Sequence, residues 1–419
     1  MSPMMEDDPI DADQDGFMLL QHGHRDMVEA VAFNSYGDRF ASGSVDGKIK
    51  VYNRHRDMSW NLCDTWGAHT AEILQIQWLP TAIHPSLLAS IGTDGKFKLW
   101  VEDPTLSPQK GRRFNSHSSK PVFELRSPSR SPFLSFSISH NPETHHTYLA
   151  LINRSGVLVV WENEFAENLE SWTEVDSVNV CEKPGRGEET SFRVQFDPSL
   201  EPCYTALRHG VPRDALGIVV ASMDRASIWR TKEVSHNVSL GHSSSKELYL
   251  AAELKGHRGL VRDVAWASGS MRGFDVVATA CKDGFVRVFQ VAATEGKGRR
   301  SRSRVAERDV SPRRREENGG QRNVPSGIGA GLAGARQRPE EGVREGEVMH
   351  VAKEVSKLDN NKMPVWRLHF DADGQMLASV GDDGKLLMWR REPNDLNKRI
   401  SSQESPPGSM DNLPHYPAR

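Results

Sequence analysis

The sequence predicts an all-β fold, a six-bladed β-propeller, because one composite pattern recurs along its 419 residues. The pattern opens with a polar hydrogen-bonding residue that is followed by apolar residues at fixed offsets. It closes with a hydroxyl residue, an Asp-Gly pair and an aromatic residue. Four copies keep the same internal spacing, and fixed-period self-similarity is the signature of a repeat architecture.

The residues of the four copies can be read directly from the sequence. The openings are His24 with Val28, Val31 and Phe33; His69 with Ile73, Ile76 and Trp78; His257 with Val261, Val264 and Trp266; and Asn361 with Val365, Leu368 and Phe370. The closings are Ser42, Asp46, Gly47 and Tyr52; Ser90, Asp94, Gly95 and Trp100; Thr279, Asp283, Gly284 and Phe289; and Ser379, Asp383, Gly384 and Trp389.

Each element of the repeat has a local reason to form. The apolar positions after the opening residue predict an inner strand, and residues 88–91 predict the next strand. Asp94 and Gly95 predict a hairpin turn, because glycine accepts a positive φ and aspartate caps its own backbone. Residues 96–100 then alternate polar and apolar side chains, as a half-buried strand does. Each copy is therefore expected to form a small antiparallel sheet.

This pattern is the signature of a WD-repeat blade. In that family the His, the Ser or Thr, the Asp and the aromatic residue form a hydrogen-bonded tetrad, which implies the same for the residues above. Each member satisfies the buried polar atoms of the others, so removing one costs ~1–3 kcal/mol. We interpret these His and Asp residues as structural rather than catalytic.

Two further blades are expected where the pattern is degenerate. Residues 148–161 carry Ser155 where the aspartate should stand, and residues 217–229 keep Asp224 but lack the glycine. We expect apolar packing to replace the tetrad in both. Their inner strands are predicted at Phe136 and Ile138, and at Phe192, Val194 and Phe196. The closing aromatic residues, which number six and so predict six blades, are Tyr52, Trp100, Trp161, Trp229, Phe289 and Trp389.

Composition and turn-forming residues indicate the expected boundaries of the ordered domain. Residues 1–15 are predicted as a disordered acidic N-terminus without a secretion signal, 16–391 as the propeller, and 392–419 as a disordered tail. Disordered loops are expected at about 104–132, between blades two and three, and at about 292–347, between blades five and six. The second loop is rich in Arg, Gly, Ser and Pro, which cannot bury enough apolar surface to order. A solvated loop, a nuclear-localisation patch, nucleic-acid contact and phosphorylation at Ser311 remain open.

Signals for chemistry are scarce. We find no P-loop, GxSxG or HExxH motif, so no catalytic or cofactor-binding residue and no cofactor is predicted. His140, His145 and His146 cluster in a stretch that reads as a surface loop, which makes a metal site a minor alternative. The cysteines Cys63, Cys181, Cys203 and Cys281 are far apart and are expected to be buried reduced thiols. No apolar run is long enough for a membrane span. A net charge of −3 argues against a general polyanion binder.

Three stretches give a closer resemblance. The first 100 residues, 161–172 (WENEFAENLESW) and 365–389 (VWRLHFDADGQMLASVGDDGKLLMW) resemble the SEH-type nucleoporins. That family is the small WD-repeat subunit of the Y-shaped outer-ring complex of the nuclear pore, and is a sister of the WD-repeat subunit of the COPII coat. The resemblance covers all six blades and is absent from the Arg-rich insertion.

The resemblance implies an open six-bladed WD-repeat propeller that an α-solenoid nucleoporin completes with a further blade in trans, by β-augmentation. The candidate interface stretches are 17–31 and 365–370, although ordinary core is the alternative for most of their side chains. The segment after Trp389 shows no apolar alternation for an outermost strand of blade six. Residues 17–20 are an alternative source of that strand, which would close the ring without a partner.

The expected function is therefore a non-enzymatic scaffold at the nuclear envelope, in the nuclear pore complex, that supports nucleocytoplasmic transport of protein and mRNA. The implied partners are the other outer-ring nucleoporins and a coat-like complex at the vacuole membrane that regulates TOR signalling. Membrane association is expected only through these complexes, and no direct nucleic-acid site is expected. The alternatives are a COPII coat subunit, a peptide-reading propeller in a ubiquitin ligase and, least favoured, an enzymatic propeller.

Overall fold

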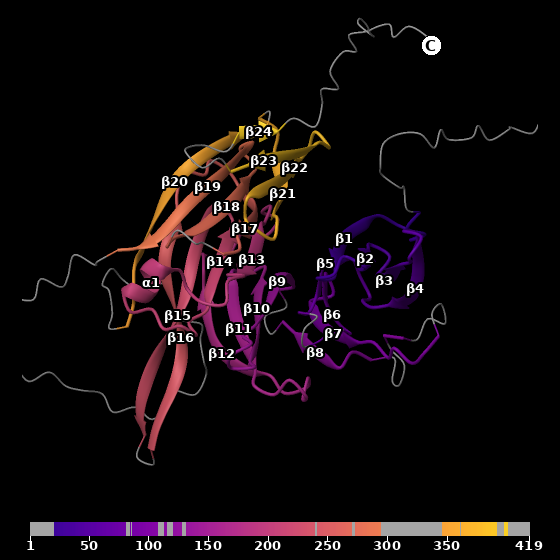
Figure 1. Ribbon diagram of the computed structural model, residues 1–419, viewed down its shortest axis with the longest axis horizontal. Coiled ribbons are helices and arrows are strands. Elements are labelled where there is room, and N and C mark those ends of the chain that lie inside the picture. The colour runs from indigo at the N-terminus through magenta and orange to yellow at the C-terminus, as the bar shows by residue number, and fades with distance from the viewer. Residues whose placement is uncertain are drawn as a thin grey trace, which may run out of the picture. The chain divides into compact units, whose positions relative to one another are not determined.

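The computed structural model describes residues 21–80, 84, 86–107, 113–114, 120–127, 131–238, 241–269, 273–294, 346–360, 362–391 and 398–400. The chain divides into two compact units, Met1–Arg126 and Ser127–Arg419 (Figure 1). Six four-stranded antiparallel sheets make up these units, two in the first and four in the second. They confirm the predicted all-β, six-bladed propeller, and each sheet is one blade.

The first unit contains blades one and two. Blade one consists of β1 (Val28–Phe33), β2 (Arg39–Ser44), β3 (Lys48–Arg54) and β4 (Trp60–Gly67). Blade two consists of β5 (Ile73–Trp78), β6 (Leu87–Gly92), β7 (Lys96–Val101) and β8 (Phe123–Arg126). In both sheets the strands pair in sequence order, with the first strand of the repeat at one edge.

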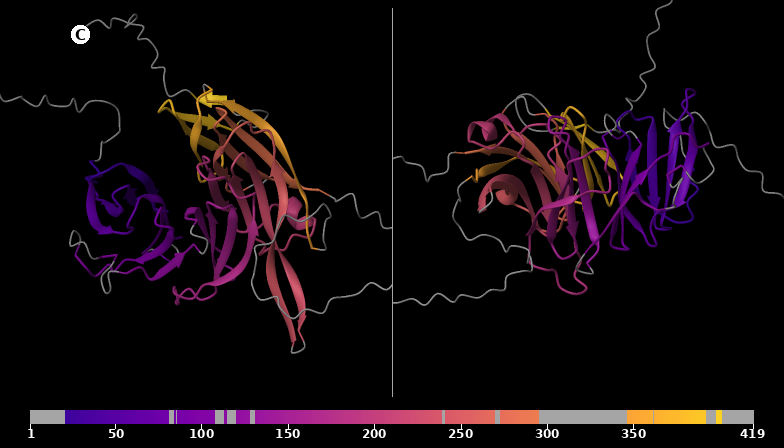
Figure 2. Two further views of the ribbon diagram at one scale, coloured as in Figure 1. Left: turned by 180° about the vertical axis from the view of Figure 1, so that it is seen from behind. Right: turned by 90° about the horizontal axis from the view of Figure 1, so that it is seen from below.

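The second unit contains blades three to six. Blade three consists of β9 (Phe133–His140), β10 (Thr147–Asn153), β11 (Val157–Asn163) and β12 (Thr173–Asn179). Blade four consists of β13 (Phe192–Phe196), β14 (Gly217–Ser222), β15 (Arg225–Val238) and β16 (Gly241–Leu254), with the short helix α1 (Tyr204–Arg208) between β13 and β14. The long β15–β16 hairpin extends beyond the other strands of this unit (Figure 2).

Blades five and six complete the second unit. Blade five consists of β17 (Val261–Trp266), β18 (Asp275–Cys281), β19 (Phe285–Ala293) and β20 (His350–Asp359). Blade six consists of β21 (Val365–Phe370), β22 (Met376–Gly381), β23 (Leu386–Arg390) and β24 (Lys398–Ile400).

The hydrophobic core lies between neighbouring blades. Every residue of the second strands β6, β10, β14 and β18 is buried, because both faces of these sheets are covered. Separate apolar clusters join blades one and two, three and four, four and five, and five and six. A single blade cannot bury its apolar faces alone, so each blade depends on its neighbours for stability.

The Asp-Gly turns form as the sequence predicts. Gly47, Gly95, Gly284 and Gly384 have φ values of 74°, 77°, 85° and 66°, in the left-handed region that favours glycine. Each turn joins the second and third strands of its blade, so the conserved spacing of the pattern fixes the register of the central hairpin.

The structure corrects the placement of both predicted loops. The Arg-rich segment does not separate blades five and six, because β19 and β20 pair on either side of it, with Ala293 opposite His350. It is an insertion in a hairpin of blade five, and residues 295–345 lie outside the described residues. The segment 104–132 likewise contains β8, whose Phe123 and Leu125 pair with Leu99 and Phe97. The fourth strand of a blade carries no motif, which is why the sequence did not locate it.

Blade six also differs from the prediction. Its outermost strand is β24, which pairs with β23 through Lys398 to Arg390 and Ile400 to Met388. The segment after Trp389 therefore supplies this strand despite its lack of apolar alternation, since backbone hydrogen bonds need no particular side chain. Residues 17–20, the alternative source, lie outside the described residues. So do 1–15 and most of 392–419, for which the predicted disorder stays a prediction. No helix in the described ranges is long and apolar enough to span a membrane.

Replacing residues 297–343 with a short Gly-Ser linker should leave the fold intact. The insertion joins two paired strands, and each halving of loop length lowers the closure cost by only ~0.6 kcal/mol. We expect the free energy of unfolding to rise by about 1 kcal/mol, measured by denaturant titration with circular dichroism. A large loss of stability would show that the insertion packs against the blades.

Candidate functional site

Blade two contains a complete tetrad. His69 Nδ1 lies 3.0 Å from Asp94 Oδ1, and His69 Nε2 lies 2.9 Å from the hydroxyl of Ser90. Trp100 Nε1 donates to the same hydroxyl at 2.9 Å. Although burial alone would raise it, the hydrogen bond and electrostatic attraction of His69 lower the pKa of Asp94 to about 2. The aspartate is therefore charged and held, as a structural group should be.

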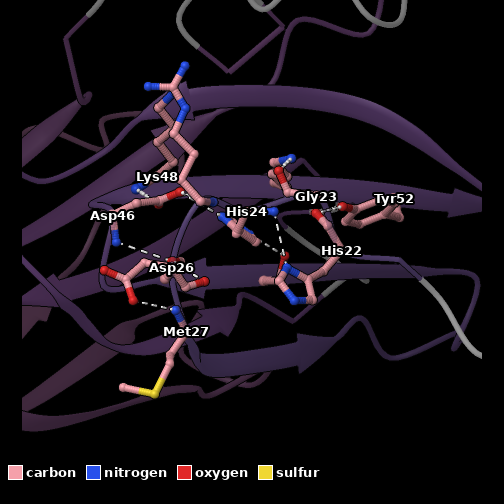
Figure 3. Close-up of polar contacts among 12 residues, drawn as sticks. His22, Gly23, His24, Asp26, Met27, Asp46, Lys48 and Tyr52 are labelled. Carbon is pink, nitrogen blue, oxygen red and sulfur yellow. Dashed lines mark hydrogen bonds and ion pairs between the residues drawn. The ribbon is translucent and has the colours of Figure 1, made fainter. Parts of the chain in front are cut away.

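Blade one varies this arrangement at its aromatic residue. His24 Nε2 lies 2.9 Å from the Ser42 hydroxyl, and Nδ1 lies 3.4 Å from Asp46 Oδ2. The hydroxyl of Tyr52 instead donates to the carbonyl of His22, at 2.7 Å (Figure 3). The hydroxyl of a tyrosine extends further than the indole N–H of a tryptophan. Tyr52 therefore bonds the backbone that precedes His24 and not the hydroxyl of Ser42.

In blade five an arginine replaces the histidine as the partner of the aspartate. His257 Nε2 lies 2.8 Å from the Thr279 hydroxyl, as the pattern implies. Asp283, however, accepts two hydrogen bonds from Arg287, the shorter at 2.6 Å. Phe289 contributes no hydrogen bond, and its ring centroid lies 6.1 Å from that of His257. Burial, together with the positive charge of Arg287, lowers the pKa of His257 to about 4.

In blade six the opening residue shifts by one position. Ser379 accepts a hydrogen bond from Trp389 Nε1 at 3.0 Å and donates to Asn360 Oδ1 at 3.4 Å. Asn360 is buried, whereas Asn361, which the spacing singled out, lies outside the described residues. Asp383 accepts from the backbone N–H of Lys385 and so caps the turn. Two adjacent asparagines make this shift invisible to a spacing argument.

Blades three and four do not replace the tetrad with apolar packing alone, which corrects the prediction. In blade three the hydroxyls of Ser131 and Ser155 lie 2.6 Å apart, and the Asn153 side chain accepts from the backbone of the turn. In blade four Trp229 Nε1 donates to Ser227, 3.0 Å away on its own strand. At the positions of the tetrad, these blades use a different set of hydrogen-bond partners.

The first strand of blade one is exposed where the corresponding strand of blade two is buried. Ile76 and Trp78 are each 6% exposed, because they pack on blade one, and Trp78 Nε1 donates to the carbonyl of Ala32. The equivalent residues of blade one are Val31 and Phe33, which are 55% and 59% exposed. This strand therefore presents the apolar residues of a blade interface without a covering blade.

Blade six exposes the complementary face. Leu386 is 53% exposed, whereas the residues at its position in blades one, two and five are fully buried: Ile49, Phe97 and Val286. Val380 is 36% exposed, and the equivalent Ile91 and Ala280 are fully buried. The second strand is buried throughout in blades two to five, whereas in β22 Val380 is exposed and Met376 and Ala378 are only partly buried. We call Val31 with Phe33, and Val380 with Leu386, the two end faces.

The remaining candidates do not form a chemical site. His140 lies 2.9 Å from the hydroxyl of Thr147, and His146 lies 2.7 Å from Glu162, so these histidines do not converge. No group of three or more metal-ligating side chains occurs among the residues that the structure describes. Cys63, Cys203 and Cys281 are buried as predicted, and Cys181 is partly exposed. The described geometry supports binding through surfaces, and the end faces are its strongest feature.

Comparisons with known proteins agree with the fold. The family model described as WD domain, G-beta repeat matches residues 17–53, 249–290 and 352–390. The chain is 40% identical to nucleoporin SEH1 of Chaetomium thermophilum over 515 aligned residues, which cover 93% of this chain and 95% of that protein. It is 27% identical to nucleoporin SEH1 of Saccharomyces cerevisiae, over 88% of this chain and 93% of that protein. For nucleoporin seh1 of Schizosaccharomyces pombe the identity is 28%, over 91% and 94%.

The blades, their tetrads and the family match define a WD-repeat β-propeller that acts as a structural scaffold and not as an enzyme. Identity at this level over nearly the whole chain narrows the class further. The chain belongs to the nucleoporin SEH1 family, and is thus a scaffold subunit of the nuclear pore.

The buried histidine of blade five should make stability depend on pH. The pKa of His257 is about 4 in the folded chain against 6.5 for an unperturbed histidine, so the unfolded chain binds the proton first as pH falls. Its contribution is complete above pH 6.5 and decreases between pH 6.5 and pH 4.

We expect wild-type chain to lose about 1–3 kcal/mol from this histidine over that range. His257→Gln keeps a hydrogen-bonding group for Thr279 but does not titrate, so its loss should be smaller by that amount. Denaturant titrations at both ends of the range measure the difference. Equal losses in the two proteins would mean that His257 is not the titrating group.

Proposed function

We propose that the protein is a subunit of the Y-shaped outer-ring complex of the nuclear pore, where it supports nucleocytoplasmic transport of protein and mRNA. An α-solenoid nucleoporin donates a further blade to it in trans, and other outer-ring nucleoporins bind the assembly. The observation that carries the proposal is the exposure of the two end faces. These residues occupy positions that are buried between blades elsewhere in the chain.

A donated blade fits the end faces better than an unrelated surface does. Val31 and Phe33 repeat the positions through which Ile76 and Trp78 dock on their neighbour, and Leu386 repeats the position that receives such a strand. Each of these side chains is about half exposed, so covering it is worth about 1 kcal/mol. A blade can offer either kind of contact: an inner strand to Val380 and Leu386, or an apolar sheet surface to Val31 and Phe33.

The outer edge of blade six argues for a partner rather than for closure by residues 17–20. Self-closure by that segment needs an empty place beside β23, and β24 already pairs there through Lys398 and Ile400. The partner would then contribute a separate blade and not a missing strand. The named relatives, which are nucleoporins, also favour the pore over the COPII coat and over a ubiquitin ligase.

A second role rests on family resemblance alone. SEH-type nucleoporins also serve a coat-like complex at the vacuole membrane that regulates TOR signalling, and we propose that this chain does so too. Its association with that membrane would be indirect, through the complex. Affinity purification of the tagged chain with mass spectrometry of stoichiometric partners tests both roles: outer-ring nucleoporins support the first, and vacuolar coat subunits the second.

Charged substitutions in the end faces should abolish the association. We expect Phe33→Asp and Leu386→Asp each to weaken binding of the purified solenoid nucleoporin by about 30-fold or more, because truncating a central interface residue commonly costs 2 kcal/mol or more. Isothermal titration calorimetry measures the affinity. Both side chains are exposed in the free chain, so the thermal unfolding midpoint should stay close to that of the wild type.

Tyr36→Asp is the matched control. Tyr36 is an aromatic residue of blade one that is 70% exposed and lies in the turn between β1 and β2, and it is not one of the end-face residues. It should bind like the wild type. Wild-type affinity in Phe33→Asp and Leu386→Asp would show that no blade docks on these faces.

A further inference from the structure

Polar side chains of the inner strands couple consecutive blades of the second unit. Ser135 and Ser137 of β9 accept hydrogen bonds from the backbone N–H groups of Val194 and Phe196, at 3.2 and 3.1 Å. Each side chain therefore satisfies a donor on the open edge of the following strand, which has no strand partner there. We call these two places on each inner strand, the third and fifth residues of β9, its coupling positions.

The same coupling continues from blade four to blade six. On β13 the coupling positions hold Arg193 and Gln195, and Gln195 Oε1 accepts from the N–H of Trp266 at 2.9 Å. On β17, Asp263 Oδ2 accepts from the N–H of Leu368 at 3.0 Å. Each of these blades thus offers at least one acceptor to the next, and the series runs through serine, glutamine and aspartate.

Charges also alternate along the first coupling position. Arg193 Nε lies 4.0 Å from Asp263 Oδ1, and both side chains are largely buried. The next residue in this row is Arg367 of β21. Burial, with the positive charge of Arg367 nearby, lowers the pKa of Arg193 to about 10. The row therefore reads cation, anion, cation, and it ends at blade six.

Blade six ends the row with an arginine at the first coupling position, where blade four has Arg193. Its coupling positions hold Arg367 and His369, both exposed. A guanidinium has five N–H donors and no acceptor, so Arg367 cannot satisfy a backbone N–H of a following blade. Within the described ranges it donates to the carbonyl of Trp366 at 3.2 Å and has no ion pair. The row of first coupling positions therefore ends at Arg367, a cation without a carboxylate partner in the described part of the chain.

We propose that the blade docking on blade six carries an aspartate or glutamate at the first coupling position of its inner strand, and that this carboxylate pairs with Arg367. The inference rests on the proposed donated blade and specifies its chemistry. The Arg193–Asp263 pair between blades four and five is its template in this chain. An acidic inner strand extends the alternation of charge, whereas an inner strand without an acceptor leaves Arg367 buried and uncompensated, which is costly.

The test measures the affinity of the full chain for the solenoid nucleoporin at low and high salt. We expect Arg367→Glu, which places two carboxylates together, to weaken binding by about 10- to 100-fold. Arg367→Met keeps the length of the side chain without its charge, and should weaken binding by about 3- to 10-fold and reduce its salt dependence. Lys353→Glu is the control, because it makes the same charge reversal at an exposed residue of the outer strand β20.

A charge exchange identifies the partner residue. Replacing one acidic residue of the donated inner strand with lysine should restore the affinity of Arg367→Glu and lower that of the wild type. Thermal unfolding of each variant shows whether it is folded. If Arg367→Glu does not fold, Arg367→Met still tests the proposal.

The outcomes separate the two proposals. If both Arg367 variants bind like the wild type while Leu386→Asp does not, a blade docks but carries no carboxylate at this place, and the inference is wrong. If Leu386→Asp also binds normally, the donated blade itself is wrong.

Discussion

The packing of one blade on the next is the interaction on which the whole structure depends. Second strands such as β10 and β14 are buried on both faces, and the apolar clusters run between blades and not within them. A four-stranded sheet of this size cannot bury enough surface alone. Stability is thus shared between neighbours, and it is lowest where a neighbour is missing. The end faces follow from this rule, because a repeat that is buried in the middle of the series is exposed at its ends.

The polar groups at the blade edges are subordinate to this packing, and they vary accordingly. Only blade two, among the blades described, joins histidine, hydroxyl, aspartate and aromatic residue in one network. Blade five instead pairs Asp283 with Arg287, and blade three uses Asn153. What these blades have in common is that the carboxylate or side-chain amide at the turn accepts hydrogen bonds, since leaving such a group unpaired costs ~1–3 kcal/mol. The requirement is fixed, and the residues that meet it are interchangeable.

This difference explains what the sequence predicts well. The Asp-Gly turns and the strands beside them depend on a few adjacent residues, so their spacing identifies four blades, and the closing aromatic residues add the two degenerate ones. The fourth strands have no such local signal: β20 follows a long insertion, and β24 contains Lys398, Arg399 and Ile400 without alternation. Spacing alone does not show that Ser379 bonds Asn360 and not Asn361, because the two asparagines are adjacent. Nor does it show that Asp283 bonds Arg287 and not His257, because this depends on how the side chains pack. The exposure of Phe33 and Leu386 could not be predicted from the sequence either, because the equivalent residues of other blades are buried in the core.

Apolar end faces alone would make a poor basis for choosing a partner, because blades of this kind resemble one another. An inner strand offers backbone N–H groups to the preceding blade, and blades three to five meet them with acceptors such as Ser135, Gln195 and Asp263. At blade six, as at Arg193 of blade four, the first coupling position offers only donors, and a strand that places a carboxylate there, as β17 places Asp263 near Arg193, matches it. Specificity is a difference between affinities, and a mismatch that excludes the wrong strand contributes to it as much as a match that favours the right one. The apolar residues thus supply affinity for any blade, while Arg367 favours a blade that brings a carboxylate.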